Sequence, residues 1–241
     1  MIDIFSLTTN KLVERLKEGE ISSVEVCTQY IERIKKFEKD VKAWAHFDKK
    51  ELLEKAAEAD EHRKSGKPLG ALHGLPVAIK DIIGTLDMPT ECGTVIRKKM
   101  TGSQEAEVVN LLKIAGAIIM GKTETTELAY FHPGKTTNPH DHTRTPGGSS
   151  SGSAAAIAAH MAPLSIGSPT TLNSLPNESA PTGTDTAAPV SITSTPLAKP
   201  SVGPNAKHLA QEFPTCCSTS RTNLSPSFSN SKALNISGKL F

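Results

Sequence analysis

Apolar positions recur every three or four residues through the first quarter of the chain, which is the spacing of an amphipathic helix. Thr8 or Thr9 can cap a first helix that ends before Gly19, and Ser22 with Glu25 forms a capping box for a second helix that runs to about Phe37. A third helix starts at Asp48. The pattern predicts three packing helices with these residues inward: Leu12, Val13 and Leu16; Cys27, Tyr30, Ile31 and Ile34; Leu52, Leu53, Ala56 and Ala59.

From about residue 70 onward, short apolar runs replace the helical period. Residues 77–79, 117–121 and 163–167 have the pattern of buried strands. Helical segments lie between and after the first two: residues 104–115, a short helix over 124–130, and the Ala-rich run that follows Ser153. Strands that alternate with helices predict an α/β fold with a mainly parallel sheet.

The character of the chain changes at Ser168. From there to Phe241 roughly four residues in ten are Ser, Thr or Pro, and charged residues are about half as frequent as before. Such a segment buries too little apolar surface to offset its ordering entropy. We therefore expect two parts: an ordered portion over residues 1–167, and a tail over 168–241 that is largely irregular and disordered.

Charge and cysteine content exclude several classes of protein. The formal net charge is +2 and aromatic residues make up 4% of the chain, which gives no electrostatic or stacking basis for binding nucleic acid or an anionic membrane. No apolar run is long enough for a bilayer-spanning helix, and the N-terminus lacks the features of a secretory signal. The 4 cysteines form no disulfide framework, so we expect a reduced, cytoplasmic protein.

Candidate chemistry gathers at two places. Residues 147–153 are all Gly or Ser and open into the Ala-rich segment, where helix N–H groups favour an oxygen that becomes negative during a reaction. The alternative is a plain glycine–serine loop that caps a helix. Lys80 ends a predicted buried strand, and there it either pairs with Asp81 or acts as a neutral base that activates a hydroxyl.

The sequence evidence for a kinase, a phosphate-binding loop or a metal site is weaker. Residues 77–80 match the V-A-I-K strand of protein kinases, but the other kinase motifs are missing. The Gly/Ser stretch lacks the ending of a phosphate-binding P-loop. His132, His140 and His142 share a loop with Asp141, yet nothing supplies further metal ligands from a fixed second element.

Four motifs together resemble the amidase signature family: residues 72–81, 116–123, 138–141 and 145–154, in the family's order and spacing. This resemblance implies the amidase signature fold, with a mixed, mainly parallel sheet, helices on both faces, and part of the domain missing. It also implies hydrolysis of linear amides by a Ser–cis-Ser–Lys triad through an acyl-enzyme. Lys80 matches the family's base, and Ser149 matches the bridging serine on a cis peptide. Gly147, Gly148 and Ser150 match the substrate loop, and neither a metal nor a cofactor is required.

The resemblance ends where the composition changes. Counted without a gap, Asn173 stands where the family has its nucleophilic serine, and Ser174 is one residue away. Thr170, Thr171 and Leu172 stand where glycines and backbone N–H groups form the family's oxyanion hole. We therefore expect this chain to be inactive as an amidase. A frameshift, mis-splicing or a faulty gene model after Gly167 is our hypothesis for the change.

Three functional interpretations stay open. The first is an amidase that acts on a small-molecule amide. The second is the glutaminase component of a tRNA-dependent amidotransferase (its A subunit), which needs companion subunits. The third is a truncated, non-catalytic pseudoenzyme or binding protein. A homodimer is compatible with each of them.

Overall fold

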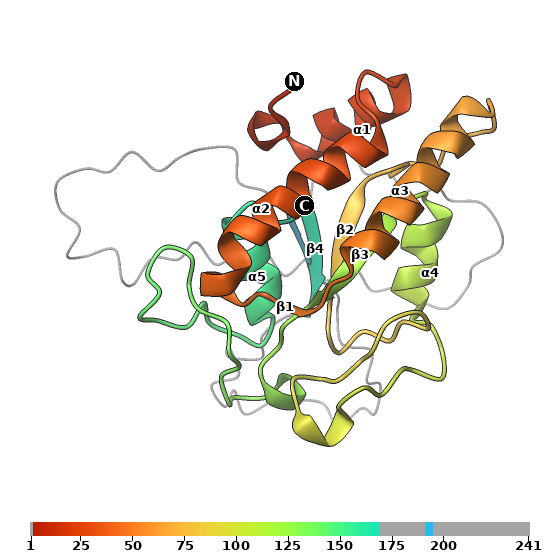
Figure 1. Cartoon of the computed structure of the whole chain (residues 1–241). Coiled ribbons are helices and arrows are strands. Elements are labelled where there is room, and N and C mark those ends of the chain that lie inside the picture. Colours follow the sequence, from red (N-terminus) through yellow and green to blue (C-terminus); the bar gives the residue numbers. More distant parts are fainter. Residues whose placement is uncertain (1, 169–190, 195–241) are drawn as a thin grey trace, which may run out of the picture. The chain divides into compact units, whose positions relative to one another are not determined.

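The computed structural model describes residues 2–168 and 191–194, all of which belong to one unit of the chain (Figure 1). Its centre is a five-stranded sheet in the order β1-β3-β2-β4-β5. The three inner strands are parallel: β2 (Pro76–Lys80), β3 (Ile118–Thr123) and β4 (Leu164–Gly167). These are the three strands that the apolar runs predict, and each is buried over its whole length.

Three helices precede the inner strands, as predicted: α1 (Thr9–Glu18), α2 (Ser23–Val41) and α3 (Lys49–Lys64). Thr8 caps α1, the Ser22–Glu25 capping box starts α2, and Asp48 caps α3. The α2 helix continues about one turn beyond the predicted end at Phe37 and stops where Lys42 takes a left-handed conformation. Local capping chemistry therefore sets all three helix starts.

Two edge strands are absent from the sequence-based prediction. The β1 strand (Trp44–His46) pairs antiparallel with β3, and β5 (Ser191–Ser194) pairs antiparallel with β4. The sheet is therefore mixed, with antiparallel edges around a parallel centre. The β5 strand corrects the prediction of an irregular tail for its own four residues, whereas 169–190 and 195–241 lie outside the described residues.

The connections between the parallel strands place helices on both faces of the sheet. The chain passes from β2 to β3 through α4 (Glu107–Ile114), and then back past β2 to β4 through α5 (Ser151–Ala158). Right-handed crossovers in opposite directions put the two helices on opposite faces, and Figure 1 shows them on either side of the strands. The loops after β2 and β3 consequently meet at the carboxyl edge of the sheet, where α/β proteins form their sites.

One predicted helix is wrong. Residues 124–130 form only the 3-10 turn η3 (Glu127–Ala129), and Leu128 and Ala129 have positive φ values of 50° and 58°. The N–H of Leu128, which a helix would pair with Glu124 O, donates instead to Cys92 O, and Glu124 O accepts from Gly152 N. Because these groups bind other segments, they are not available for a helix.

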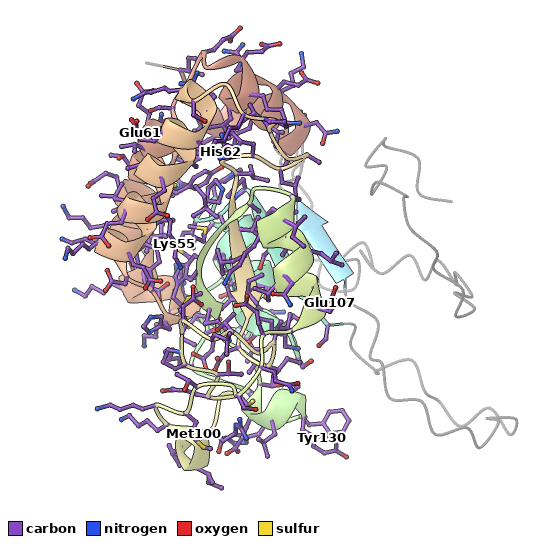
Figure 2. All side chains as sticks on the ribbon, turned by 90° about the vertical axis from the view of Figure 1, so that its right-hand side faces the viewer. Lys55, Glu61, His62, Met100, Glu107 and Tyr130 are labelled. Carbon is purple, nitrogen blue, oxygen red and sulfur yellow. The ribbon has the colours of Figure 1, made fainter. Side chains whose placement is uncertain are left out.

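Short 3-10 turns and exposed apolar side chains mark the remaining loops. The turns η1 (Ile4–Ser6) and η2 (Val95–Arg97) lie at the N-terminus and in the long connection after β2. Figure 2 shows Met100 and Tyr130 at the same end of the molecule, on loops that follow β2 and β3. Large side chains of these loops are exposed to solvent: Val95, Ile96, Leu128, Tyr130 and Phe131.

The α5 helix packs closely against the sheet because of one glycine. The N–H of Gly152 donates to Glu124 O, and a Cβ on Gly152 would collide with Ala43 O and Glu124 N. Those two atoms form the hydrogen bond that joins the start of β1 to the end of β3. Only glycine allows the first turn of α5 to lie this near the strand end.

We therefore predict that Gly152→Ala lowers the free energy of unfolding by about 1–3 kcal/mol, because the added methyl group forces backbone apart in a packed region. Urea denaturation followed by circular dichroism measures the change. Ala154→Ser, at an exposed position of the same helix, serves as the control and should have an effect below about 0.7 kcal/mol. Equal midpoints for both variants would contradict the close approach.

Candidate functional site

Lys80 is the centre of the candidate site. It is the last residue of β2, its side chain is 0% exposed, and its Nζ lies 2.6 Å from Ser149 Oγ and 2.6 Å from Ser168 Oγ. Ser149 precedes α5, and Ser168 follows β4 directly. The structure thus brings together Lys80 and Ser149, which the sequence singled out, and adds a second hydroxyl. The catalytic roles of Lys80 and Ser149 stay predictions.

Asp81 is not the partner of Lys80. Its carboxylate accepts hydrogen bonds from Glu91 N at 3.1 and 3.2 Å and lies 3.7 Å from Lys122 Nζ. Successive side chains of a strand point to opposite faces, so Lys80 and Asp81 are directed apart. The structure thus removes the simple alternative of a lysine–aspartate pair.

The peptide bond between Gly148 and Ser149 is cis. The carbonyl of Ser149 accepts hydrogen bonds from Thr125 Oγ1 and Thr126 N, each at 3.0 Å. Gly147 has a φ of 86°, which favours glycine, and a Cβ on Gly148 would collide with Thr126 Cγ2. The two glycines and the two threonines together fix the backbone that carries Ser149.

The first turn of α5 is held against two strands. Ser153 Oγ lies 2.7 Å from Thr123 Oγ1 on β3 and 3.4 Å from Ile166 O on β4. Ser150 Oγ donates to Ser168 O at 2.9 Å and accepts from Ser168 N at 3.1 Å. Because the Ser150 hydroxyl is occupied by the backbone of Ser168, its contact with a substrate stays a prediction, as it does for Gly147 and Gly148.

A second lysine in the interior allows a comparison. Burial lowers the pKa of Lys80 and of Lys122 to about 8, and the Asp81 carboxylate opposes this shift for Lys122. Lys122 Nζ donates to Ile83 O at 2.7 Å, Thr90 Oγ1 at 2.8 Å and Pro89 O at 3.3 Å. Carbonyl oxygens and a carboxylate can only accept, so this environment holds a charged ammonium.

The environment of Lys80 is different. Both of its hydrogen-bond partners are hydroxyls, and a hydroxyl can either accept from an ammonium or donate to a neutral amine. No carboxylate of the described residues stabilises the charged form, and desolvation by burial accounts for the lowered pKa. Of the two lysines, Lys80 has the surroundings of a general base, whereas Lys122 has those of a structural cation.

Ser168 is the residue that sequence reasoning missed. The prediction places it at the start of the disordered tail, but its hydroxyl contacts Lys80 and its backbone pairs with Ser150. A signal was available, since Ser168 directly follows the third buried run, and parallel strands end at the same edge of a sheet. Thr170, Thr171, Leu172, Asn173 and Ser174, the predicted oxyanion and nucleophile positions, lie outside the described residues.

Metal-ligating clusters and membrane spans were the other candidates. Within residues 2–168 and 191–194, no group of three or more His, Cys, Asp or Glu lies close enough together to hold a metal ion. In the same part of the chain, no helix has the length and apolar character needed to cross a bilayer.

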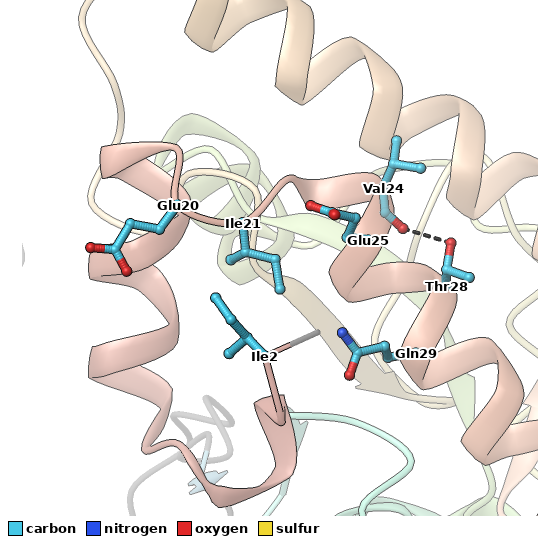
Figure 3. A pocket seen from close by; sticks show the side chains of 7 residues that line it. All are labelled: Ile2, Glu20, Ile21, Val24, Glu25, Thr28 and Gln29. Atoms are coloured by element: carbon cyan, nitrogen blue, oxygen red, sulfur yellow. Dashed lines mark hydrogen bonds between the residues drawn. The ribbon is translucent and has the colours of Figure 1, made fainter.

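A pocket of about 480 Å³ lies between the ends of α1 and α2 (Figure 3). Ile2, Ile21 and Val24 line it together with Glu20, Glu25, Thr28 and Gln29. Glu25 is already engaged by the capping box, and Thr28 Oγ1 donates to Val24 O at 2.7 Å. None of the residues that contact Lys80 lines this pocket, so it is separate from the candidate site.

The contrast between the two lysines predicts different losses of stability. Lys122→Met leaves the Asp81 carboxylate and two carbonyl oxygens buried without a cation, which should reduce the free energy of unfolding by about 3–5 kcal/mol. Lys80→Met leaves two neutral hydroxyls and no buried charge, so its loss should be smaller, about 1–2 kcal/mol. Urea denaturation of both variants tests this difference. An equal or larger loss for Lys80→Met would contradict the assignment of Lys122 as the structural cation.

Comparison with known proteins places this site in a family. The family model described as Amidase matches residues 25–171. The A subunit of the glutamyl-tRNA(Gln) amidotransferase of Salinispora tropica is 39% identical over 176 residues, covering 70% of this chain and 36% of the relative. The corresponding protein of Streptomyces coelicolor is 36% identical over 209 residues, covering 84% of this chain and 40% of the relative. The chain thus spans little more than a third of the length of these relatives.

The fold agrees with this comparison. The X-ray structure of a peptide amidase from Stenotrophomonas maltophilia has a TM-score of 0.64 and 31% sequence identity, covering 69% of this chain and 37% of that protein. The order of the motifs, the Lys80–Ser149 contact and the family match agree with one another. The chain belongs to the amidase signature family.

Proposed function

We propose that the site has the chemistry of amide C–N bond hydrolysis by a serine–lysine pair, limited in this chain to activated small-molecule amides and esters, with Lys80 as the general base and Ser149 as the bridging serine. The observation that carries this proposal is the buried hydrogen bond of 2.6 Å between Lys80 Nζ and Ser149 Oγ. A dry environment and hydroxyl partners favour the neutral amine, which is the form that can take a proton.

The reaction follows from these two groups. Neutral Lys80 takes the proton of a nucleophilic hydroxyl, through Ser149 or by direct contact, as that hydroxyl attacks the substrate carbonyl. The C–N bond then breaks, and the amine leaves with the proton returned through Ser149. Water attacks the acyl ester by the same path and releases the acid and the free hydroxyl.

The sequence after β4 limits the range of substrates. The positions at which the family has its oxyanion glycines and nucleophilic serine hold Thr171, Leu172 and Asn173. Loss of one oxyanion donor lowers turnover by about 10²–10³. We therefore propose that simple amides are not detectably turned over by this chain, whereas acyl compounds with good leaving groups, which need less stabilisation of the oxyanion, react.

The first test uses p-nitrophenyl acetate and an activated anilide. Lys80→Met and Ser149→Ala should each slow the release of the chromophore by about 100-fold or more, the size of a lost general base. Lys35→Ala is the control, because surface lysines react directly with activated esters and the Lys35 side chain is 76% exposed. Loss of reactivity in Lys80→Met with the rate retained in Lys35→Ala is the expected result.

Two outcomes would contradict this proposal. If Lys80→Met and Lys35→Ala release the chromophore at the same rate as the original chain, the site is not hydrolytic and the pseudoenzyme interpretation replaces it. Ammonia release from simple amides, measured alongside, tests the proposed limit. Substantial turnover there would show that the substitutions after Gly167 do not remove the family's activity.

The pH dependence provides a separate prediction. Lys80 must be neutral to accept a proton, and its pKa is lowered to about 8. The rate of release that depends on Lys80 should therefore rise with pH, reach half its maximum near pH 8 and stay level above it. Subtracting the rate of Lys80→Met at each pH removes hydroxide-driven hydrolysis. A midpoint near 10.5, the ordinary lysine value, would contradict the desolvated amine.

The relatives favour a second candidate within the same chemistry. Both amidotransferase relatives are named as one lettered subunit of their enzyme, which implies assembly with other subunits in those proteins. For this chain the corresponding proposal is a glutaminase subunit that releases ammonia to companion subunits. Glutamine-dependent ammonia release only in the presence of co-purifying subunits would favour it over a free-standing amidase. The same purification reports whether the chain is a homodimer.

A further inference from the structure

We propose that Ser168 is the nucleophile of this chain, an assignment that rests on the proposed serine–lysine function. Ser168 Oγ lies 2.6 Å from Lys80 Nζ, the same distance as Ser149 Oγ. A hydroxyl in direct contact with a neutral amine can lose its proton as it attacks a carbonyl. Ser168 can therefore supply the nucleophilic hydroxyl, which Asn173 lacks because its side chain is an amide.

Burial distinguishes the two serines. Ser149 is 7% exposed, and its carbonyl is held by Thr125 and Thr126, so its hydroxyl lies within the protein beside Lys80. Ser168 is partly exposed, at the edge where β4 ends. A nucleophile must reach a substrate carbonyl, whereas a relay only needs to contact the base. The exposed fractions of the two residues thus assign the attack to Ser168, which contacts Lys80 directly, and the return of the proton to the leaving group to Ser149.

Backbone hydrogen bonds hold Ser168 in place, so its hydroxyl is not needed to anchor the residue. Its N–H and C=O both pair with Ser150 Oγ, at 3.1 and 2.9 Å. Ser150 is also the N-cap residue of α5, so the positive end of that helix lies beside Ser168. Helix N-termini favour negative charge, which here stabilises both the alkoxide that forms as the proton leaves and the oxyanion that follows.

The acylation step balances with these groups alone. Neutral Lys80 takes the proton of Ser168 Oγ, the Oγ–C bond to the acyl carbon forms, and the bond to the leaving group breaks. The leaving group departs as an anion, or takes the proton from the Lys80 ammonium. A fluorophosphonate reacts in the same manner: the Oγ–P bond forms, the P–F bond breaks, fluoride leaves, and the proton stays on Lys80.

The test is covalent labelling of the full chain with an alkyl fluorophosphonate, followed by intact mass and peptide mapping. We expect one adduct per chain, on Ser168, formed more rapidly as the pH rises toward 8. Ser168→Ala should lose the adduct, and Lys80→Met should slow its formation about 100-fold. Ser103→Ala, in an exposed loop, is the control and should label as the original chain does.

Mapping on the original chain tests the assignment even if Ser168→Ala fails to fold. An adduct on Ser149 or Ser174, or no adduct at all, would overturn it. The result is also separable from that of the proposed function. Lys80-dependent chromophore release that persists in Ser168→Ala would refute only the assignment of Ser168, whereas release independent of Lys80 would refute serine–lysine hydrolysis itself.

Discussion

The structure depends on a lysine that is buried without an anion. An ammonium in the interior is costly unless it is paired, and within residues 2–168 and 191–194 the hydrogen-bond partners of Lys80 are two hydroxyls. The neutral amine relieves that cost, and hydroxyls can adapt to either protonation state. The rest of the site follows from this constraint, since the Ser149 backbone, the start of α5 and the end of β4 all serve to bring hydroxyls to Nζ.

The parallel sheet provides the two dry compartments that this arrangement needs. Helices on both faces leave the inner strands without solvent on either side. Lys80 points to the side of Ser149, and its neighbour Asp81 points to the side of Lys122. A one-residue slip of β2 would exchange these side chains and place a carboxylate beside the serines. The register of β2 against β3, with Lys80 opposite Thr123, therefore determines which lysine is a base.

The sequence predicted the features whose causes are local. The caps of α1, α2 and α3 and the three buried strands are specified by residues that are near one another in the chain. The edge strand β1 is only three residues long, and it exists because β3 provides a partner. The predicted helix over residues 124–130 failed for the same reason, since Leu128 N–H and Glu124 O, which a helix would pair, bond to the distant segments of Cys92 and Gly152. Pairings across the fold have no periodic signal in the sequence.

The same limit applies to the site: residues within recognisable motifs were predicted, and a residue that depends on strand pairing was not. The resemblance implied Lys80 and Ser149, but strand alternation alone could have separated Lys80 from Asp81. To predict that Ser168 belongs to the site, one must know that β4 lies next to β2. The pairing of Ile79 with Ile166 establishes this. That pairing brings the end of β4 beside the end of β2, and the hydrogen bonds of the Ser168 backbone to Ser150 place the Ser168 hydroxyl beside Lys80. Asn173 and Ser174 are five and six residues further on, up to roughly 17–20 Å of extended chain, so a hydroxyl at Ser174 would require a specific turn back. Glycines ordinarily provide such a turn, and residues 168–176 contain none. Ser168, the first residue after β4, is therefore the serine of this segment that contacts the base with the fewest intervening residues.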